Sequence, residues 1–279
     1  MLKKLDLHME WRRLATGLCF LTFICGGFVL TILVLPIILL CSSQPEQTEG
    51  RVLRLIRFCF KLFMQYMQAL KPMKAFNIEG IEHARTLNGC IFIANHPTLI
   101  DVVAVLSCLP PSHCIVKTSL LDHFYLGRIM RAAGYIANDH VTQLLQGCQK
   151  SLQSGRSLLI FPEGTRSPAY GLHAFSRGAA QIALRIGAPV VPIVITCEPL
   201  TLLKGDPWYA VPPEPVTLTL RFLPALDIPQ TITDKGGMPL QARALTRYFE
   251  DFFRCQLREM AEVSTAPYAP SSWCTPDPR

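Results

Sequence analysis

The clearest structural signal in the chain is the segment Cys90-Ile-Phe-Ile-Ala-Asn-His-Pro-Thr-Leu-Ile-Asp101. It begins with a short apolar run, which is typical of a strand buried on both faces of a sheet. A polar loop and the start of a helical pattern follow. Because this order recurs further along the chain, we expect an α/β fold built on a mainly parallel sheet.

The other expected elements lie outward from this segment. Apolar runs predict strands at residues 90–94, 113–116, 157–161, 190–195 and 216–222. Amphipathic stretches predict helices at residues 98–106, 124–133, 141–154, 177–186 and 238–262. Residues 77–263 are therefore expected to form a mixed, mainly parallel sheet flanked by helices, and residues 264–279 a loose tail.

Composition narrows the classes of protein to which the chain can belong. Half of the 279 residues are hydrophobic and 17% are charged, which excludes a disordered chain. Lys and Arg number 27 against 20 Asp and Glu, a balance that favours an anionic partner such as a phospholipid surface. The eleven cysteines are scattered, so neither a zinc ribbon nor an extracellular disulfide scaffold is expected. No other cluster of metal ligands is apparent in the sequence.

The N-terminal 50 residues are expected to anchor the chain in a membrane. Residues 14–41 contain no charged side chain, and this run exceeds the roughly 20 helical residues that cross a bilayer. A single helix must tilt, or the segment must break near Gly26, Gly27 or Pro36. Lys and Arg gather on both flanks, which favours a re-entrant or monotopic anchor with both ends cytoplasmic. A tilted single span and a buried core helix are the alternatives.

Residues 51–76 are predicted to form a basic amphipathic helix, or two helices divided before Pro72. Lys, Arg and Gln recur every three or four residues, with large apolar residues between them. Such a helix suits the surface of an anionic membrane, although packing against the core of the domain would give the same pattern.

Two polar blocks follow predicted strands and carry candidate chemistry. In Asn95-His96-Pro97-Thr98-Leu99-Ile100-Asp101, the aspartate can hold one ring nitrogen of His96 and leave the other to accept a proton. In Phe161-Pro-Glu-Gly-Thr-Arg-Ser167, glycine allows close backbone approach and Arg166 offers a fork to a phosphate or carboxylate. Taken singly, a chance His–Asp pair and a surface turn remain the alternatives.

Together with Val190-Val-Pro-Ile-Val-Ile195, and in this order, these blocks resemble those of the glycerolipid (lysophospholipid) acyltransferase family. The resemblance covers about residues 75–200 and extends to the membrane-associated N-terminal helices. It implies that His96 and Asp101 are the catalytic pair. It also implies that the acceptor and its phosphate are bound by Glu163, Gly164, Thr165 and Arg166, and that Pro192 belongs to the third block.

One position departs from the pattern of that family. An Arg that grips the phosphate of the acceptor usually follows a Gly by six residues, but Gly134 is followed at that distance by His140. A neutral imidazole is a poorer phosphate ligand than a guanidinium. Either another cation takes this role, or the acceptor lacks a phosphate. The further candidate site residues are Asn95, Lys117, Arg128, Arg131 and His140.

The resemblance implies an O-acyltransferase that uses acyl-CoA or acyl-acyl carrier protein, without a cofactor or metal. 1-Acyl-glycerol-3-phosphate is the leading acceptor, and phosphatidic acid the product. No Gly-x-Ser-x-Gly motif occurs, so we expect direct transfer without an acyl-enzyme. Open alternatives are a phosphate-free lyso-lipid or a specialised metabolite as acceptor, a thioester hydrolase, and an inactive scaffold. A nucleic-acid partner is not expected, since the basic residues lie beside apolar segments. The expected location is a membrane; in a bacterium, the cytoplasmic side of the inner membrane.

Overall fold

The structure is a computed structural model that describes residues 7–263, so the predicted tail at 264–279 lies outside the described residues. The helices are α1 (Leu7–Val29), the π-helical segment η1 (Leu30–Val34), α2 (Leu35–Leu40), α3 (Pro45–Ala69), α4 (Glu82–Arg85), α5 (Asp101–Cys108), α6 (Thr118–Leu121), α7 (Leu126–Ala132), α8 (Val141–Gln153), α9 (Arg177–Ile186), α10 (Gln230–Thr233) and α11 (Met238–Val263). The strands are β1 (Met73–Glu79), β2 (Ile91–Ala94), β3 (His113–Val116), β4 (Ile136–Ala137), β5 (Leu158–Ile160), β6 (Val190–Glu198) and β7 (Val216–Phe222).

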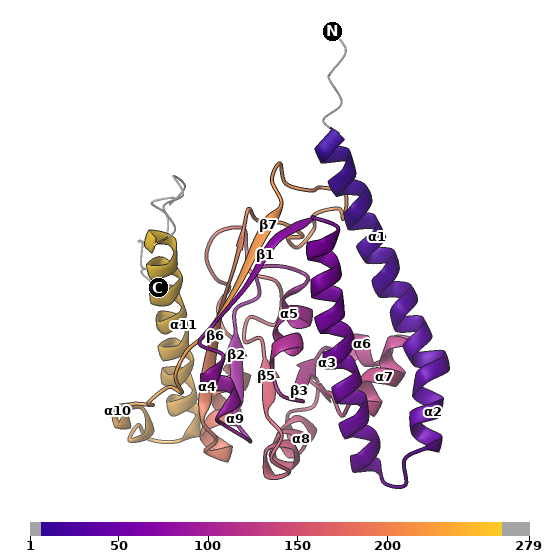
Figure 1. Ribbon diagram of the computed structural model, residues 1–279. Coiled ribbons are helices and arrows are strands. Elements are labelled where there is room, and N and C mark those ends of the chain that lie inside the picture. Colours follow the sequence, from indigo (N-terminus) through magenta and orange to yellow (C-terminus); the bar gives the residue numbers. More distant parts are fainter. Residues whose placement is uncertain (1–6, 264–279) are drawn as a thin grey trace.

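The strands form one sheet in the order β1-β7-β6-β2-β5-β3-β4 (Figure 1). All neighbouring pairs are parallel except β6 and β7, which are antiparallel. The predicted mixed, mainly parallel sheet flanked by helices is therefore confirmed. Because β2, β3, β5 and β6 run in the same direction, the loops that follow them meet at one edge of the sheet.

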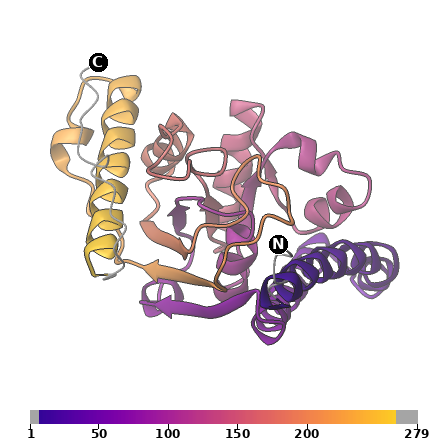
Figure 2. The same ribbon diagram turned by 90° about the horizontal axis from the view of Figure 1, so that it is seen from above.

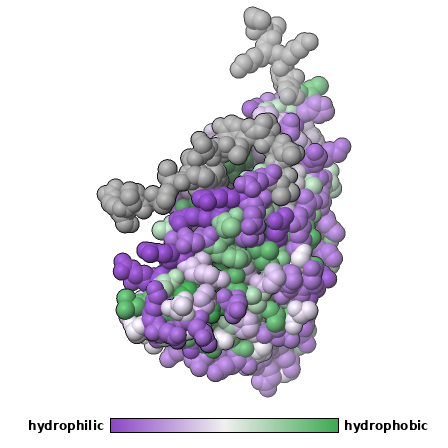
Figure 3. Space-filling model, turned by 90° about the vertical axis from the view of Figure 1, so that its left-hand side faces the viewer, coloured by the Kyte–Doolittle hydropathy of each residue, from purple (hydrophilic) through white to green (hydrophobic). Residues whose placement is uncertain are grey.

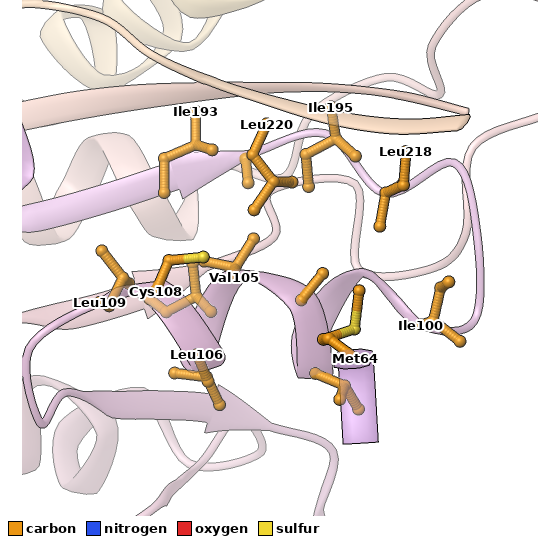
Figure 4. Packing of buried hydrophobic residues seen from close by; sticks show 14 of the residues in the cluster. Met64, Ile100, Val105, Leu106, Cys108, Leu109, Ile193, Ile195, Leu218 and Leu220 are labelled. Carbon is orange, nitrogen blue, oxygen red and sulfur yellow. The ribbon is translucent and has the colours of Figure 1, made fainter. Parts of the chain in front are cut away.

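Helices cover both faces of this sheet. On one face, α3 and α5 pack against the inward side chains of β6 and β7, as Figure 4 shows for Met64, Val105 and Ile195. On the other face, α9 and α11 enclose a second apolar cluster that contains Ile182 and Phe249. Viewed from above, α11 and the N-terminal helices lie at opposite sides of the molecule (Figure 2). The uninterrupted apolar runs of the central strands follow from burial on both faces.

All five predicted strands and all five predicted helices are present; β3, β7 and α9 have the predicted bounds, and the others have shifted ends. Two predicted boundaries are wrong. The helix predicted within residues 51–76 is α3, which begins at Pro45 and ends at Ala69, and the α/β domain begins with β1 at Met73 rather than at residue 77. The strand β1 lies at the edge of the sheet and pairs with β7, so a distant partner decides its conformation.

The N-terminal region forms a helical hairpin. Leu7–Leu40 is one continuous helix, and α3 returns beside it (Figure 1). The expected break at Gly26, Gly27 or Pro36 does not occur. The departure from regular α-helix is the π-helical segment η1, which ends two residues before Pro36.

Leu7–Leu40 exposes most of its apolar side chains. Among residues 7–263 it is the one helix long and apolar enough to cross a membrane, and 11% of its most apolar 18-residue window is buried. A core helix would be mostly buried, so that alternative is wrong. The face on the α11 side is, by contrast, largely hydrophilic with scattered hydrophobic residues (Figure 3). The large exposed residues of the N-terminal helix include Leu7, Leu14, Leu18, Leu21, Ile24, Phe28, Leu33, Ile37 and Leu40.

An ion cluster fastens the start of α3 to the amino ends of β3 and β5. The Glu49 carboxylate lies 3.0 Å from Nε2 of His113 and 2.6 Å from Nε of Arg156, and Nδ1 of His113 contacts the Ser151 hydroxyl at 2.8 Å. A Cβ at Gly134 would stand 2.8 Å from both Glu49 and His113. Gly134, from which the six-residue spacing to His140 is counted, therefore has no room for a side chain, because Glu49 and His113 approach it closely.

Replacing Glu49 with glutamine is expected to lower the free energy of unfolding by about 1–3 kcal/mol at neutral pH. Burial raises the pKa of Glu49, but His113 and Arg156 together outweigh it and hold that pKa below its ordinary value of 4.5. The contribution of Glu49 is therefore present above pH 4.5 and is lost as the pH falls below it. Urea denaturation of both proteins at several pH values measures the difference.

The matched control is Glu46→Gln, an exposed carboxylate in the first turn of the same helix. It should change stability by less than Glu49→Gln, and with no comparable pH dependence. Equal effects of the two substitutions at every pH would contradict a stabilising role for the ion cluster.

Candidate active site

His96 and Asp101 come together at the carboxyl end of β2. Nδ1 of His96 lies 2.8 Å from Oδ2 of Asp101, and the two side chains are 16% and 0% exposed. The loop of Asn95 to Ile100 turns the chain sharply, and α5 begins at Asp101 itself, rather than at residue 98. The predicted pairing of the two side chains is thus present, with Nε2 of His96 left for another partner.

Thr98 supplies the remaining ligands of the buried carboxylate. Its backbone N–H donates to Asp101 Oδ2 at 2.7 Å, and its hydroxyl donates to Oδ1 at 2.6 Å. Asp101 follows Thr98 by three residues, so its carboxylate reaches both the N–H and the hydroxyl of Thr98 across the turn that precedes α5. Burial raises the pKa of Asp101, while the contacts with His96 and Thr98 act in the opposite direction. These donors favour the charged carboxylate in an otherwise dry position.

The loop after β5 holds the backbone of His96. The His96 N–H donates to Glu163 Oε1 at 3.1 Å and to Ser167 Oγ at 3.2 Å, and the His96 carbonyl accepts the Ser167 N–H at 2.7 Å. Glu163 also accepts the Ser167 hydroxyl at 2.6 Å and the His173 N–H at 2.9 Å. Glu163 is 8% exposed and both of its oxygens are occupied, so it fixes the two loops relative to each other.

Asn95 has a comparable structural position. Its side-chain amide exchanges two hydrogen bonds of 2.8 Å with the backbone of Ile195 in β6, and the residue is 2% exposed. It therefore ties the end of β2 to the third sequence block rather than facing a ligand.

A cavity of 1310 Å³ opens beside His96. Its walls are mostly apolar and come from α1, α3, α7 and α9, with Phe23, Phe60 and Ile129 among the contributors. The ring of Phe161 also lines it and lies 4.5 Å from the His96 ring, centroid to centroid. Such a space suits a long apolar ligand with a few polar groups at one end.

The predicted cations divide into two groups. Arg166 and Lys117, with Gly164 and Thr165, line the cavity, and Nη1 of Arg166 donates to the carbonyls of Leu202 and Leu203 at 2.7 and 2.9 Å.

Arg128, Arg131 and His140 are exposed and are not among the lining residues that the structure describes. Arg131 donates to the Leu121 carbonyl, and the His140 side chain is 72% exposed. Of the cations predicted for the site, the two that line the cavity therefore come from the loops after β3 and β5.

Three positions of the site are not among the residues that the sequence predicts for it. Thr98 belongs to the first polar block and stands three residues before Asp101, a spacing at which its N–H and hydroxyl reach the carboxylate. Ser167 belongs to the second polar block, but its contact with His96 joins residues 71 positions apart, which no local pattern reveals. Arg12 is one of the charges on the flank of the apolar run, whereas the structure buries it at the wall of the cavity.

The fold and the site thus define an α/β protein in which a His–Asp pair opens onto a mostly apolar cavity that Arg and Lys side chains also line. Residues 75–196 match the family model described as Acyltransferase. The predicted relationship to the 1-acyl-glycerol-3-phosphate acyltransferases is confirmed by the following relatives.

The chain is 29% identical over 165 residues to a 1-acyl-sn-glycerol-3-phosphate acyltransferase of Limnanthes alba, covering 57% of each protein. It is 27% identical over 180 residues to the alpha form of Ovis aries, covering 61% of this chain and 59% of the relative. The aligned region thus spans somewhat more than half the length of these curated relatives. The crystal structure of the 1-acyl-sn-glycerophosphate (LPA) acyltransferase PlsC from Thermotoga maritima shares the fold, with a TM-score of 0.69, 21% identity, and coverage of 92% of this chain and 99% of that one.

Proposed function

We propose that this chain is a membrane-associated O-acyltransferase that transfers a fatty acyl group from acyl-CoA or acyl-acyl carrier protein to a lysophospholipid hydroxyl. The leading acceptor is 1-acyl-glycerol-3-phosphate, which would give phosphatidic acid. The observation that carries the proposal is the 2.8 Å contact of His96 with the buried Asp101, at the wall of an apolar cavity of 1310 Å³. The names of the curated relatives support the choice of acceptor.

The chemistry follows from the free nitrogen of His96. Nε2 removes the proton of the acceptor hydroxyl while that oxygen attacks the thioester carbonyl, and Asp101 stabilises the resulting imidazolium. The new C–O bond forms, the C–S bond breaks, and the imidazolium returns its proton to the departing thiolate. The acyl group thus passes directly to the acceptor, without a cofactor.

In this proposal, some residues of the loops bind the phosphate of the acceptor and others hold His96 in position. Arg166 and Lys117 line the cavity beside His96 and are the residues that we assign to the phosphate of the acceptor. We assign Glu163 to positioning, because its carboxylate is occupied by the backbone of His96 and His173.

The helical hairpin supports membrane association. Leu7–Leu40 and α3 lie side by side, so the chain reverses direction and returns to its starting side (Figure 1). This arrangement favours the monotopic anchor over a single span, with the catalytic domain on the cytoplasmic side. It keeps the cavity at the interface where a lyso-lipid and its product reside.

A panel of acceptors with a radiolabelled acyl donor tests the proposed function. We expect strong labelling of lysophosphatidic acid, which should fall about 10- to 100-fold in Arg166→Ala, because a charge-assisted contact with phosphate is lost. Arg166→Lys, which keeps the charge but not the fork, should be intermediate. Arg185→Ala on the exposed face of α9 is the matched control and should label normally.

The panel also tests a second candidate, an acceptor without phosphate. The observation in its favour is His140, which stands at the usual place of an Arg, is exposed, and is not among the described residues that line the cavity. Labelling of phosphate-free lyso-lipids alone, unaffected by Arg166→Ala, would establish this second candidate and contradict the first.

A further inference from the structure

Arg12 is a charged residue in an unexpected place. It lies near the start of α1, where the sequence predicts an exposed flanking charge, yet it is 7% exposed and lines the cavity. Its Nη2 donates to the carbonyl of Pro213 and lies 3.7 Å from the sulfur of Met9. Its Nε is buried and has no partner among residues 7–263. A guanidinium buried with an unsatisfied N–H costs free energy unless an anion compensates for it.

The neighbours of Arg12 could help to hold such an anion. Thr16 lies one turn further along α1, and both Thr16 and Thr201 are buried hydroxyls that line the cavity. Lys204 lines the cavity from the loop between β6 and β7. Among the lining residues that the structure describes, the one carboxylate is Glu214, which is exposed and lies next to the contact of Arg12 with Pro213.

The loop between β6 and β7 connects this region to the rest of the site. Arg166 donates to the carbonyls of Leu202 and Leu203 near the start of the loop, and Arg12 donates to that of Pro213 near its end. Both guanidiniums also line the cavity. The two cations thus hold opposite ends of one loop, and Arg12 belongs to a separate element, α1, rather than to the strand-end loops around His96.

We propose that Arg12, Thr16, Thr201 and Lys204 form a second anion subsite, which binds the phosphate at the end of the phosphopantetheine arm of the acyl donor. The proposal rests on the proposed function. CoA and acyl carrier protein present the acyl group on the same arm, so one subsite serves either donor.

The chemistry of the two substrates assigns the subsite to the donor. In the acceptor, the reacting hydroxyl and the phosphate are a few bonds apart, so its phosphate must lie close to His96. In the donor, the whole pantetheine arm separates the thioester from its phosphate. The donor therefore needs a cation on another part of the cavity wall, and Arg12 supplies one.

Steady-state kinetics of the full chain in phospholipid micelles test the subsite. Arg12→Gln is expected to raise the KM for acyl-CoA and for acyl-acyl carrier protein about 10-fold, with kcat and the KM for lysophosphatidic acid unchanged. With an S-acyl-pantetheine that lacks the phosphate, Arg12→Gln and the unsubstituted chain should react equally. Arg12→Lys should recover part of the loss. Arg13→Gln is the matched control, since Arg13 is exposed and paired with Glu10.

The choice of donor distinguishes a phosphate subsite from a purely structural role of Arg12. An equal loss with S-acyl-pantetheine would overturn the proposal in favour of that structural role, and a raised KM for lysophosphatidic acid alone would assign the subsite to the acceptor. If Arg12→Gln does not fold, Lys204→Gln and Thr16→Val decide by the same comparison of donors. Absence of transfer by the unsubstituted chain to any acceptor would overturn the proposed function itself.

Discussion

Replacing His96 with alanine is expected to lower the turnover of acyl transfer about 10²–10⁴-fold, which is the usual contribution of a general base. A lipid hydroxyl attacks a thioester slowly unless its proton is removed, and His96 is the base that lines the cavity. Initial rates with saturating donor and acceptor measure the effect on turnover. The KM values should change little, because the cations that we assign to the phosphates remain in place.

Two controls make the result for His96 specific. His83→Ala makes the same change on α4, away from the cavity lining, and should leave the rate unchanged. His96→Ala should remain folded by circular dichroism and should co-sediment with phospholipid vesicles, since the apolar helix Leu7–Leu40 is unchanged. Full activity in a folded, membrane-bound His96→Ala would contradict the assignment of the base.

The same physical reasons explain which parts of the fold could be predicted from the sequence. The central strands are buried on both faces and therefore appear as apolar runs, and β3 and β7 end where the runs end. The edge strand β1 has a mostly exposed pattern with Lys74, Asn77 and Glu79, so its sequence resembles the polar side of a helix. Its partner β7 lies some 140 residues away, and local pattern carries no information about this pairing.

The residues of the site likewise fall into those that local sequence predicts and those that depend on distant contacts. His96 and Asp101 are five residues apart and lie on a strand, a loop and a helix start that the sequence indicates. The positioning of His96 by Glu163 and Ser167 depends on two loops meeting at one edge of the sheet, which only the order of the strands determines. The burial of Arg12 could not be predicted, because the charge pattern of a helix does not reveal which loop packs over it.

Asp101→Asn is expected to lower turnover about 10²–10⁴-fold while the pair of side chains keeps its place. The amide cannot stabilise an imidazolium as a carboxylate does, and it disturbs the tautomer of His96, because Nδ1 then faces a neutral group. The KM values for donor and acceptor should again stay nearly constant.

Asp101→Asn is expected to raise the relative stability of the chain with pH although it lowers turnover. This difference separates a loss of catalysis from damage to the fold. Burial raises the pKa of Asp101 above its ordinary value of 3.8, so the folded state binds the proton of this carboxyl more tightly than the unfolded state. As the pH rises above 3.8 the carboxyl loses that proton, and the buried charge lowers the free energy of unfolding. Asp101→Asn removes this dependence. The stability of the variant relative to the unsubstituted chain should therefore increase as the pH rises from 3.8, as measured by urea denaturation. A relative stability that falls over that range would show that the hydrogen bonds from Thr98 and His96 outweigh the cost of burial, and that this carboxylate strengthens the fold as well as serving the base.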